Sequence, residues 1–199
     1  MELILASGSP RRRKVLEGLG IAFTVEPTDA AEIADPADPV RTVVMNATAK
    51  AEACRRDHPG CAVIAADTLV WFQGRLIGKP RDLEEAAAFL RAFSGGTQIV
   101  YTGLALALPG AEPDLRVEAS SVRFKRLDEG TIRTYLRLTR PLDRAGAYDI
   151  DENGELLIEG YQGSYSNIMG LPVAPVRDWI RANLLEIFPE KAHFGPFGG

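Results

Sequence analysis

The sequence has few of the cysteines and histidines that form disulfides in small proteins or bind structural metals. It has two cysteines and two histidines among 199 residues. Cys54 and Cys61 show neither a metal-ligand spacing nor a dense framework, which excludes a disulfide scaffold and a cysteine-based zinc site. Neither histidine has a metal-ligand partner at a useful spacing. We therefore expect a reducing compartment and a cytoplasmic protein.

Long hydrophobic runs and an excess of positive charge are also missing. No stretch reaches the roughly 18 apolar residues of a membrane span, and the N-terminal apolar run is too short for a secretory signal. Lys and Arg total 23 against 27 Asp and Glu, a net charge of −4. Because bulk positive charge drives non-specific nucleic-acid binding, a small anionic ligand fits better than a nucleic acid or a membrane.

The common glycine-rich nucleotide motifs are absent too. The chain has neither the P-loop pattern Gly-x-x-x-x-Gly-Lys-Ser/Thr nor the dinucleotide pattern Gly-x-Gly-x-x-Gly. Its first motif is different: an apolar run at residues 2–6 breaks into a small-residue turn and then resumes at helical spacing. Ser9 suits the N-cap of this helix and Pro10 its first position. The segment predicts a strand, a turn and a helix start.

This turn is a candidate phosphate site. Free N–H groups at a helix start favour an anion, and Arg11 and Arg12 add forked donors that match phosphate oxygens. Ser7 and Ser9 flank the same turn. An ordinary Ser-capped connection with solvated arginines is an equally open alternative.

The rest of the chain predicts a mixed α/β protein with an antiparallel portion in its middle. A loop at residues 27–39 holds Glu32, and a helix at 40–56 places Asn46 and Lys50 on one face. The expected strands are 2–6, 21–25, 62–66, 69–72, 75–77, 97–108 and 115–125, and the further expected helices are 83–93, 128–138 and 174–185.

Asp67 is the first candidate for chemistry. It follows the apolar run at 62–66, so we expect the strand to end at Asp67 and Thr68. A carboxylate in that position suits a general base or a metal ligand. A structural Asp that caps a turn through Thr68 is the alternative.

Lys79 and the later glycine-rich segments are weaker candidates. Lys79 lies between Gly78 and Pro80, where it can point at a ligand or belong to an ordinary turn. The segments 143–148 and 163–172 combine Gly with Ser, Asn or Tyr, which lets a backbone approach a ligand closely. Turns at a sheet edge have the same composition.

Taken together and in order, these motifs resemble the Maf family of nucleoside triphosphate pyrophosphatases. The resemblance covers about residues 3–184. It rests on Ser7-Gly8-Ser9-Pro10-Arg11-Arg12, Glu32, Lys50-Ala51, Ala66-Asp67-Thr68, Gly78-Lys79-Pro80, Ser94-Gly95, Thr102-Gly103, Ala145-Gly146-Ala147-Tyr148 and the segment from Gly163-Ser164-Tyr165-Ser166-Asn167 to Pro172.

The resemblance implies a fold as well as an activity. The fold is a mixed twisted sheet in an elongated two-lobed domain with a central cleft, similar to that of inosine triphosphate pyrophosphatase. Residues 1–188 then form one domain and 189–199 a flexible tail, and family members are often homodimers. The activity is hydrolysis of nucleoside triphosphates to monophosphate and pyrophosphate with a divalent metal, Mg²⁺ or Mn²⁺.

Matched motif by motif, the family's site residues fall on candidates already named. Asp67 matches the proton acceptor, and Glu32 with Asp67 the metal carboxylates. The substrate-binding positions fall on Ser7, Ser9, Arg11, Arg12, Lys50, Lys79 and Asp151.

Three positions depart from the family pattern. Asp151 stands where members that prefer dTTP and UTP carry glutamine, Gln98 replaces a histidine, and Arg144 replaces a lysine. The departure at Asp151 leaves a dTTP/UTP-like preference open. A nucleotide-binding regulator of cell division that does not hydrolyse its ligand is the rival hypothesis, and retention of both Asp67 and Glu32 disfavours it.

Overall fold

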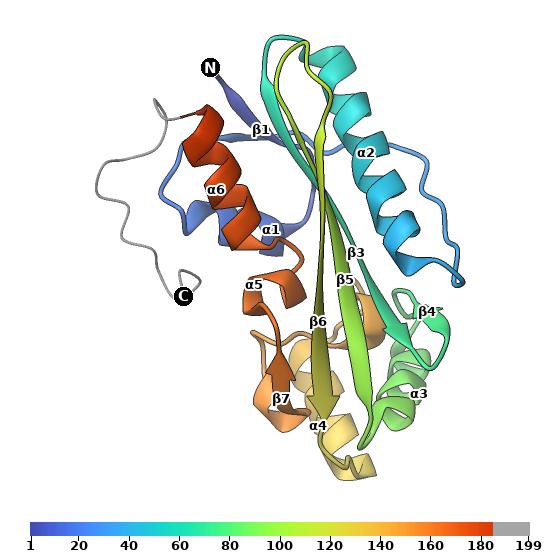
Figure 1. Cartoon of the computed structure of the whole chain (residues 1–199). Coiled ribbons are helices and arrows are strands. Elements are labelled where there is room, and N and C mark those ends of the chain that lie inside the picture. Colours follow the sequence, from blue (N-terminus) through green and yellow to red (C-terminus); the bar gives the residue numbers. More distant parts are fainter. Residues whose placement is uncertain (185–199) are drawn as a thin grey trace.

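The molecule is built on one mixed β-sheet, which the computed structural model describes together with its helices over residues 1–184 (Figure 1). The expected tail at 189–199 and the domain end at 188 lie outside the described residues. Along the sheet the strands are β2 (Thr24–Val25), β1 (Leu3–Leu5), β3 (Ala62–Phe72), β5 (Thr97–Ala107), β6 (Asp114–Phe124) and β7 (Ile158–Gln162), and β4 (Arg75–Ile77) also pairs with β3.

The sheet mixes parallel and antiparallel pairs, as the sequence predicts. Strand β1 runs parallel to β2 and β3, whereas β3, β5 and β6 form a long antiparallel meander that β7 extends at one end. Sequence patterning missed β7, and it extended the strand at Thr24–Val25 back to residue 21.

Several helices begin where the sequence offers a side-chain cap. Ser9, Asp82 and Asp128 each accept a backbone N–H three residues ahead with their side chains, which satisfies a donor that the first turn leaves open. The helices are α1 (Pro10–Glu17), α2 (Pro39–Asp57), α3 (Leu83–Phe93), α4 (Glu129–Thr139), α5 (Tyr165–Ile168) and α6 (Val173–Asn183), with short 3₁₀ turns η1 (Ala145–Ala147) and η2 (Gly154–Leu156).

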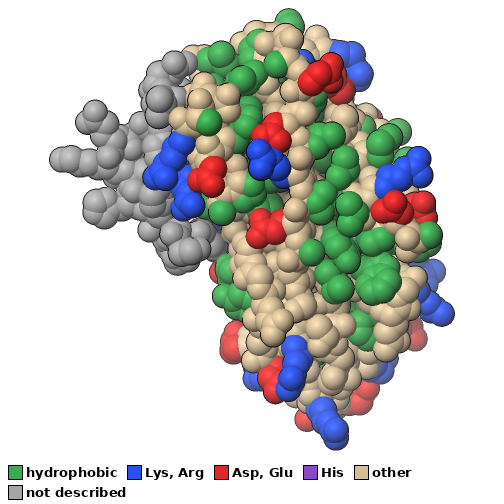
Figure 2. Space-filling view, viewed as in Figure 1, with side chains coloured by type: hydrophobic (Ala, Val, Ile, Leu, Met, Phe, Trp, Pro, Cys, Tyr) green, Lys and Arg blue, Asp and Glu red, His purple; other side chains and the backbone are tan. Residues whose placement is uncertain are grey.

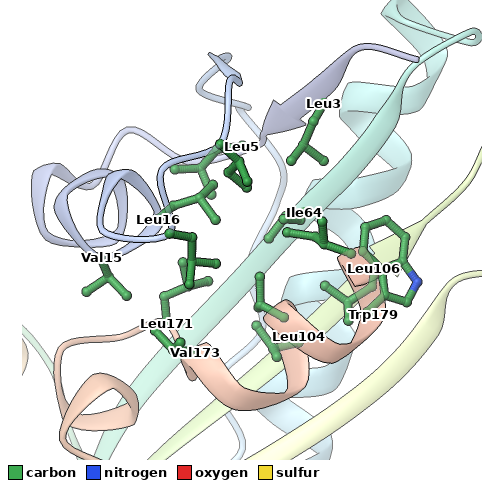
Figure 3. Close-up of a cluster of buried hydrophobic side chains, with 14 of the residues drawn as sticks. Leu3, Leu5, Val15, Leu16, Ile64, Leu104, Leu106, Leu171, Val173 and Trp179 are labelled. Atoms are coloured by element: carbon green, nitrogen blue, oxygen red, sulfur yellow. The ribbon is translucent and has the colours of Figure 1, made fainter. Parts of the chain in front are cut away.

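Two regions of hydrophobic packing give the molecule its elongated shape. In the first, α1 and α6 pack on one face of the sheet, where Leu16, Ile64 and Trp179 meet (Figure 3), and α2 covers the opposite face. In the second, α3 and α4 pack with the other ends of β3, β5 and β6 around Phe93 and Phe124. Strands β3 and β5 run through both regions, which form the two lobes.

The expected break in the strand at Asp67 is wrong. Strand β3 continues unbroken from Ala62 to Phe72, and Asp67 pairs with Gly103 in its middle. The carboxylate is tolerated there because α2 supplies hydrogen-bond donors to it, which offsets the cost of burying a charge. Position within the strand, rather than at its end, decides what Asp67 contacts.

Candidate active site

A gap along one edge of β3 creates the site. Strand β1 pairs with β3 at residues 62–64 and β4 pairs with it at 70–72. Within the described chain no strand pairs with residues 65–69 on this side. A cavity of about 530 Å³ lies there, lined by the loop that follows β1, the middle of β3 and segments 143–150 and 168–170. Asp67 and Thr68, on opposite faces of the sheet, both reach it.

Helix α2 fixes the orientation of Asp67. The Asp67 side chain is 8% exposed and accepts hydrogen bonds from Asn46 Nδ2 at 2.9 Å and Lys50 Nζ at 2.6 Å. The close approach of α2 depends on Gly103, because a Cβ at that position would lie 2.5 Å from the Val43 carbonyl oxygen. Both carboxylate oxygens are thus held, and each keeps a further lone pair for a ligand.

Asn46 also holds the loop that carries Glu32. Its side-chain amide accepts from the Ile33 N–H at 2.8 Å and donates to the Ile33 carbonyl at 3.0 Å. Glu32 then lies 2.7 Å from Lys50 Nζ, the same nitrogen that contacts Asp67. The loop, the helix and the strand therefore bring two carboxylates and one ammonium together.

These carboxylates fit a divalent cation. Glu32 and Asp67 converge on one positively charged atom, and paired carboxylates with substrate phosphates are the donors that Mg²⁺ uses in nucleotide enzymes. Across residues 1–184 no cluster of three or more His, Cys, Asp or Glu could hold a metal alone. Phosphate oxygens of a bound ligand, together with water molecules, would complete the coordination.

Arg12 anchors the opposite side of the cavity. Its guanidinium donates to the Gly170 carbonyl at 2.8 Å and to the hydroxyls of Ser7 and Thr68 at 3.0 Å each. Burial lowers the pKa of Arg12 to about 10. This value is still well above 7, so the guanidinium is charged at neutral pH. Three of its five N–H donors are used in these contacts, and two remain for an anion.

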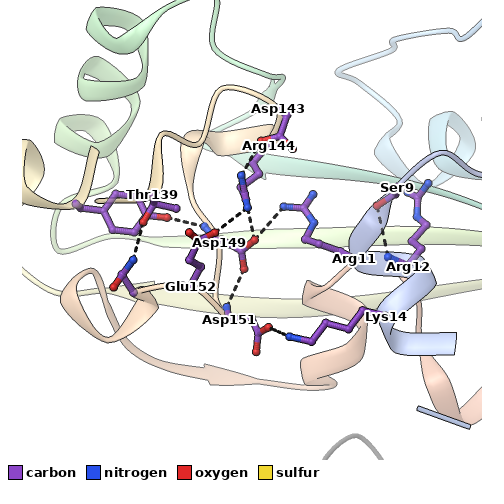
Figure 4. Close-up of polar contacts among 12 residues, drawn as sticks. Ser9, Arg11, Arg12, Lys14, Thr139, Asp143, Arg144, Asp149, Asp151 and Glu152 are labelled. Atoms are coloured by element: carbon purple, nitrogen blue, oxygen red, sulfur yellow. Dashed lines mark hydrogen bonds and ion pairs between the residues drawn. The ribbon is translucent and has the colours of Figure 1, made fainter. Parts of the chain in front are cut away.

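Two further arginines, Arg11 and Arg144, share the carboxylate of Asp149. Arg144 Nε lies 2.7 Å from Asp149 Oδ2 and Arg11 lies 3.5 Å from the same oxygen (Figure 4). Burial alone would raise the pKa of Asp149, but the hydrogen bond from Arg144 and the charge of Arg11 bring it below its usual value. Asp149 is thus ionised and holds both cations at the cavity wall.

Asp151 does not line the cavity. It forms an ion pair with Lys14 (Figure 4). It also accepts a hydrogen bond from the Tyr165 hydroxyl at 3.1 Å. Its backbone N–H donates to Asp149 at 2.8 Å. Asp151 is therefore connected to the cavity wall through Asp149 rather than through its own side chain.

The other residues that the sequence predicted for the site, Ser7, Ser9 and Lys79, also line the cavity. Ser7 is buried and accepts from Arg12, whereas Ser9 caps α1 beside it, and both line the cavity. Lys79 is exposed at the rim, and among the described residues it makes no ion pair. Apolar side chains fill the rest of the wall: Val70, Val100, Tyr148, Ile168 and Met169.

Sequence reasoning missed three contributors to this arrangement. Asn46, Thr68 and Asp149 hold catalytic candidates in place through contacts between residues distant in the chain. The helical spacing of Asn46 and Lys50 indicated their common face, but nothing in the sequence indicated that Asp67 lay beneath it. The cavity lining combines cationic side chains, which suit phosphates, with apolar side chains, which suit a flat ring.

Comparisons with known proteins agree with this chemistry. The model of the Maf-like protein family matches residues 2–183. A dTTP/UTP pyrophosphatase of Deinococcus radiodurans is 45% identical over 90% of this chain and 91% of its own length. One from Akkermansia muciniphila is 43% identical over 87% and 92%.

A solved structure is similar to part of this chain. The dITP/XTP pyrophosphatase of Mycobacterium abscessus is 20% identical, with a TM-score of 0.39 over 64% of this chain and 76% of that one. None of the helices in residues 1–184 has the length and apolar character needed to cross a membrane.

Proposed function

Because the chain belongs to the Maf-like family, we propose that it hydrolyses nucleoside triphosphates to nucleoside monophosphate and pyrophosphate, with dTTP and UTP preferred. The observation that carries the proposal is the high identity, over about nine-tenths of the chain, to relatives named dTTP/UTP pyrophosphatases. The cavity supports it, since its carboxylates and cations suit the cleavage of a phosphoanhydride bond.

Asp67 is the proposed general base. Hydrolysis at the α-phosphorus needs a water molecule that is oriented and that loses a proton as it attacks. Asn46 and Lys50 hold the Asp67 carboxylate in one orientation, with lone pairs left on both oxygens. The carboxylate takes the water proton, the bond between the α-phosphorus and the bridging oxygen breaks, and pyrophosphate leaves with the bond electrons.

The cations around the cavity bind the phosphates. Arg12 offers two remaining donors beside the Ser7 to Ser9 turn, and Arg11 and Lys79 face the same space. Positive charge fixed where the leaving group gains negative charge lowers the barrier without reorganisation. Asp151 supports this end through Lys14 and Asp149.

A divalent cation, Mg²⁺ or Mn²⁺, is the proposed cofactor. Glu32 and Asp67 would hold it, and when bound it would neutralise phosphate charge beside the attacked phosphorus. Lys50 contacts both carboxylates and keeps them close in the absence of the cation. Lys50 is then free to contact a phosphate when the cation binds.

The experiment is a pyrophosphate-release assay on a panel of triphosphates. The panel contains dTTP, UTP, CTP, GTP, ATP and methylated and deaminated analogues, each with Mg²⁺, Mn²⁺ or a chelator. We expect turnover of dTTP and UTP that depends on the metal, and a fall of about 10²- to 10⁴-fold in Asp67→Asn. The matched control is Asp178→Asn, which makes the same change at an exposed position on α6 and leaves turnover unchanged.

Each contrary outcome has a definite meaning. Full turnover by Asp67→Asn would remove Asp67 from the role of base. Tight binding of triphosphates without any pyrophosphate release would favour the regulator hypothesis. Preference for a purine triphosphate would overturn the substrate assignment alone.

A further inference from the structure

Gln98 is a polar side chain inside an apolar region. Figure 2 shows acidic and basic side chains spread over the visible face of the molecule, where water solvates them. Gln98 is instead 1% exposed, and its neighbours on the sheet, Val100 and Val122, belong to the second hydrophobic region. Among the described residues, neither polar atom of its amide has a hydrogen-bond partner of full geometry. A buried amide in this state costs free energy, which points to a use for it.

The register of the sheet places Gln98 next to the cavity. Thr68, which contacts Arg12, is followed on the same face of β3 by Val70. Val70 pairs with Val100 of β5, and both line the cavity. Gln98 is the next residue of β5 on this face, about 7 Å further along the strand. The sheet wall of the cavity thus leads from the Arg12 guanidinium, past two valines, towards the Gln98 amide.

Tyr148 connects Gln98 with the cavity. Its ring lines the cavity and packs against Phe124, with ring centroids 5.3 Å apart and planes at 76°. Burial raises the pKa of Tyr148, and the Gln98 amide opposes this rise, as does the charge of Arg11. Only a donor stabilises a phenolate, so the amide nitrogen of Gln98 is the atom that faces the phenol oxygen. Contacts of this kind often tighten into full hydrogen bonds only when a ligand is bound.

We propose that Tyr148 and Gln98 select the base of the nucleotide: the Tyr148 hydroxyl donates to the base, and Gln98 is the positioning residue that sets the direction of this donor. The inference rests on the proposed function. A phenol oxygen that accepts from the Gln98 N–H keeps its own hydrogen for another partner. The hydroxyl therefore offers the cavity a donor, while Gln98 already uses its acceptor capacity.

Pyrimidine bases differ at the edge that this donor can read. Thymine and uracil carry a carbonyl acceptor where cytosine carries an amino donor. A fixed hydroxyl donor matches the carbonyl and opposes the amino group, because two donors cannot pair. A site built to hydrogen-bond one group rejects an analogue without it far more strongly than an apolar pocket does. The pair therefore favours dTTP and UTP over CTP.

The ratio of kcat/KM for UTP to that for CTP tests the pair. Tyr148→Phe removes the hydroxyl, Gln98→Met removes the amide at nearly the same volume, and Gln98→His keeps an N–H donor. We expect the ratio to fall by about tenfold in Tyr148→Phe, because UTP loses its donor. It should also fall in Gln98→Met, because the freed hydroxyl can accept from CTP and the value for CTP rises. Gln98→His should keep most of the ratio.

Two control variants make the same changes away from the cavity. Tyr161→Phe removes a hydroxyl from a side chain that is 47% exposed, and Gln162→Met removes an exposed amide beside it. Both should leave the ratio unchanged. Thermal unfolding separates base selection from folding: Gln98→Met should have a Tm no lower than that of the wild type, since it removes a buried amide without a full partner.

Binding of the α,β-methylene analogues of UTP and CTP, measured by calorimetry with Mg²⁺, separates this inference from the proposed function. A wild type that releases no pyrophosphate from any triphosphate would overturn the proposed function, and the analogues would still show whether Tyr148 and Gln98 select the base. Equal treatment of UTP and CTP by the wild type in both assays would overturn the inference. So would a ratio that survives both Tyr148→Phe and Gln98→Met, or one that falls as far in Gln98→His as in Gln98→Met.

Discussion

Asp149 is a buried carboxylate whose charge depends on two arginines. Its pKa is lowered, so its contribution to stability is present above the unfolded value, about pH 4, and is lost as pH falls through the folded value. We expect Asp149→Asn to reduce the free energy of unfolding by about 2 kcal/mol at pH 7, because a charged hydrogen bond at a buried site is lost. At pH 3 the difference should shrink. Urea denaturation at both pH values measures it.

The neighbouring Asp143 supplies the control. It pairs with the same arginine, Arg144, but its side chain is 71% exposed, so Asp143→Asn should change stability much less. A loss for Asp149→Asn that is as large at pH 3 as at pH 7 would show that packing, not charge, is what Asp149 contributes.

At the residue level the sequence indicated which residues share a cavity better than it indicated the contacts that hold them. Ser7, Arg12, Lys50 and Asp67 all line the cavity, and their roles in the reaction stay predictions. Asn46 was placed beside Lys50 but not over Asp67. The reason is physical: the contact depends on the distance between α2 and the sheet, which no local pattern encodes.

Among the elements, periodicity and caps predicted most boundaries to within a residue or two. Strands β5 and β6 and helices α2, α3 and α4 show this, because each buries one face and has clear end signals. Strand β7 was missed since it is short, mostly exposed and contains Gly160. The break predicted within β3 failed because a charged residue was assumed to end a buried strand, whereas α2 compensates it.

The contact between α2 and β5 depends on a missing side chain. Gly103→Ala would place a methyl group 2.5 Å from the Val43 carbonyl oxygen, so α2 must move away from the sheet. We expect a loss of about 1–3 kcal/mol in unfolding free energy. We also expect turnover to fall more than in the control Gly160→Ala, because Asn46 and Lys50 move with the helix. Chemical denaturation and the pyrophosphate assay measure the two effects.

Gly160→Ala is the matched control for this substitution. Gly160 also lies in a strand, but nothing lies within 4 Å of the position that its Cβ would take. This variant should keep both stability and turnover. Normal turnover in Gly103→Ala would mean that Asp67 does not need α2 in its present position.

At the scale of the whole molecule, the cavity lies where the two lobes meet. The turn from Ser7 to Arg12 lies beside the first hydrophobic region. Tyr148 belongs to the second region, and Arg144 lies in the same segment of the chain. Strands β3 and β5 contribute side chains to both regions. A lobe that unfolded alone would therefore have to break strands that the other lobe still needs.

We propose on this basis that the two lobes unfold as one cooperative unit. The two tryptophans report on different regions: Trp179 is buried in the first, and Trp71 lies in β3 between Val70 and Phe72 of the second. Trp71→Phe and Trp179→Phe each leave one reporter. In each variant the urea transition seen by fluorescence should coincide with that seen by far-UV circular dichroism, as two-state unfolding requires. Comparing each variant with itself removes any change in stability caused by the substitution. A fluorescence transition that precedes the loss of helix in either variant would instead divide the chain into two domains, with the cavity at the boundary between them.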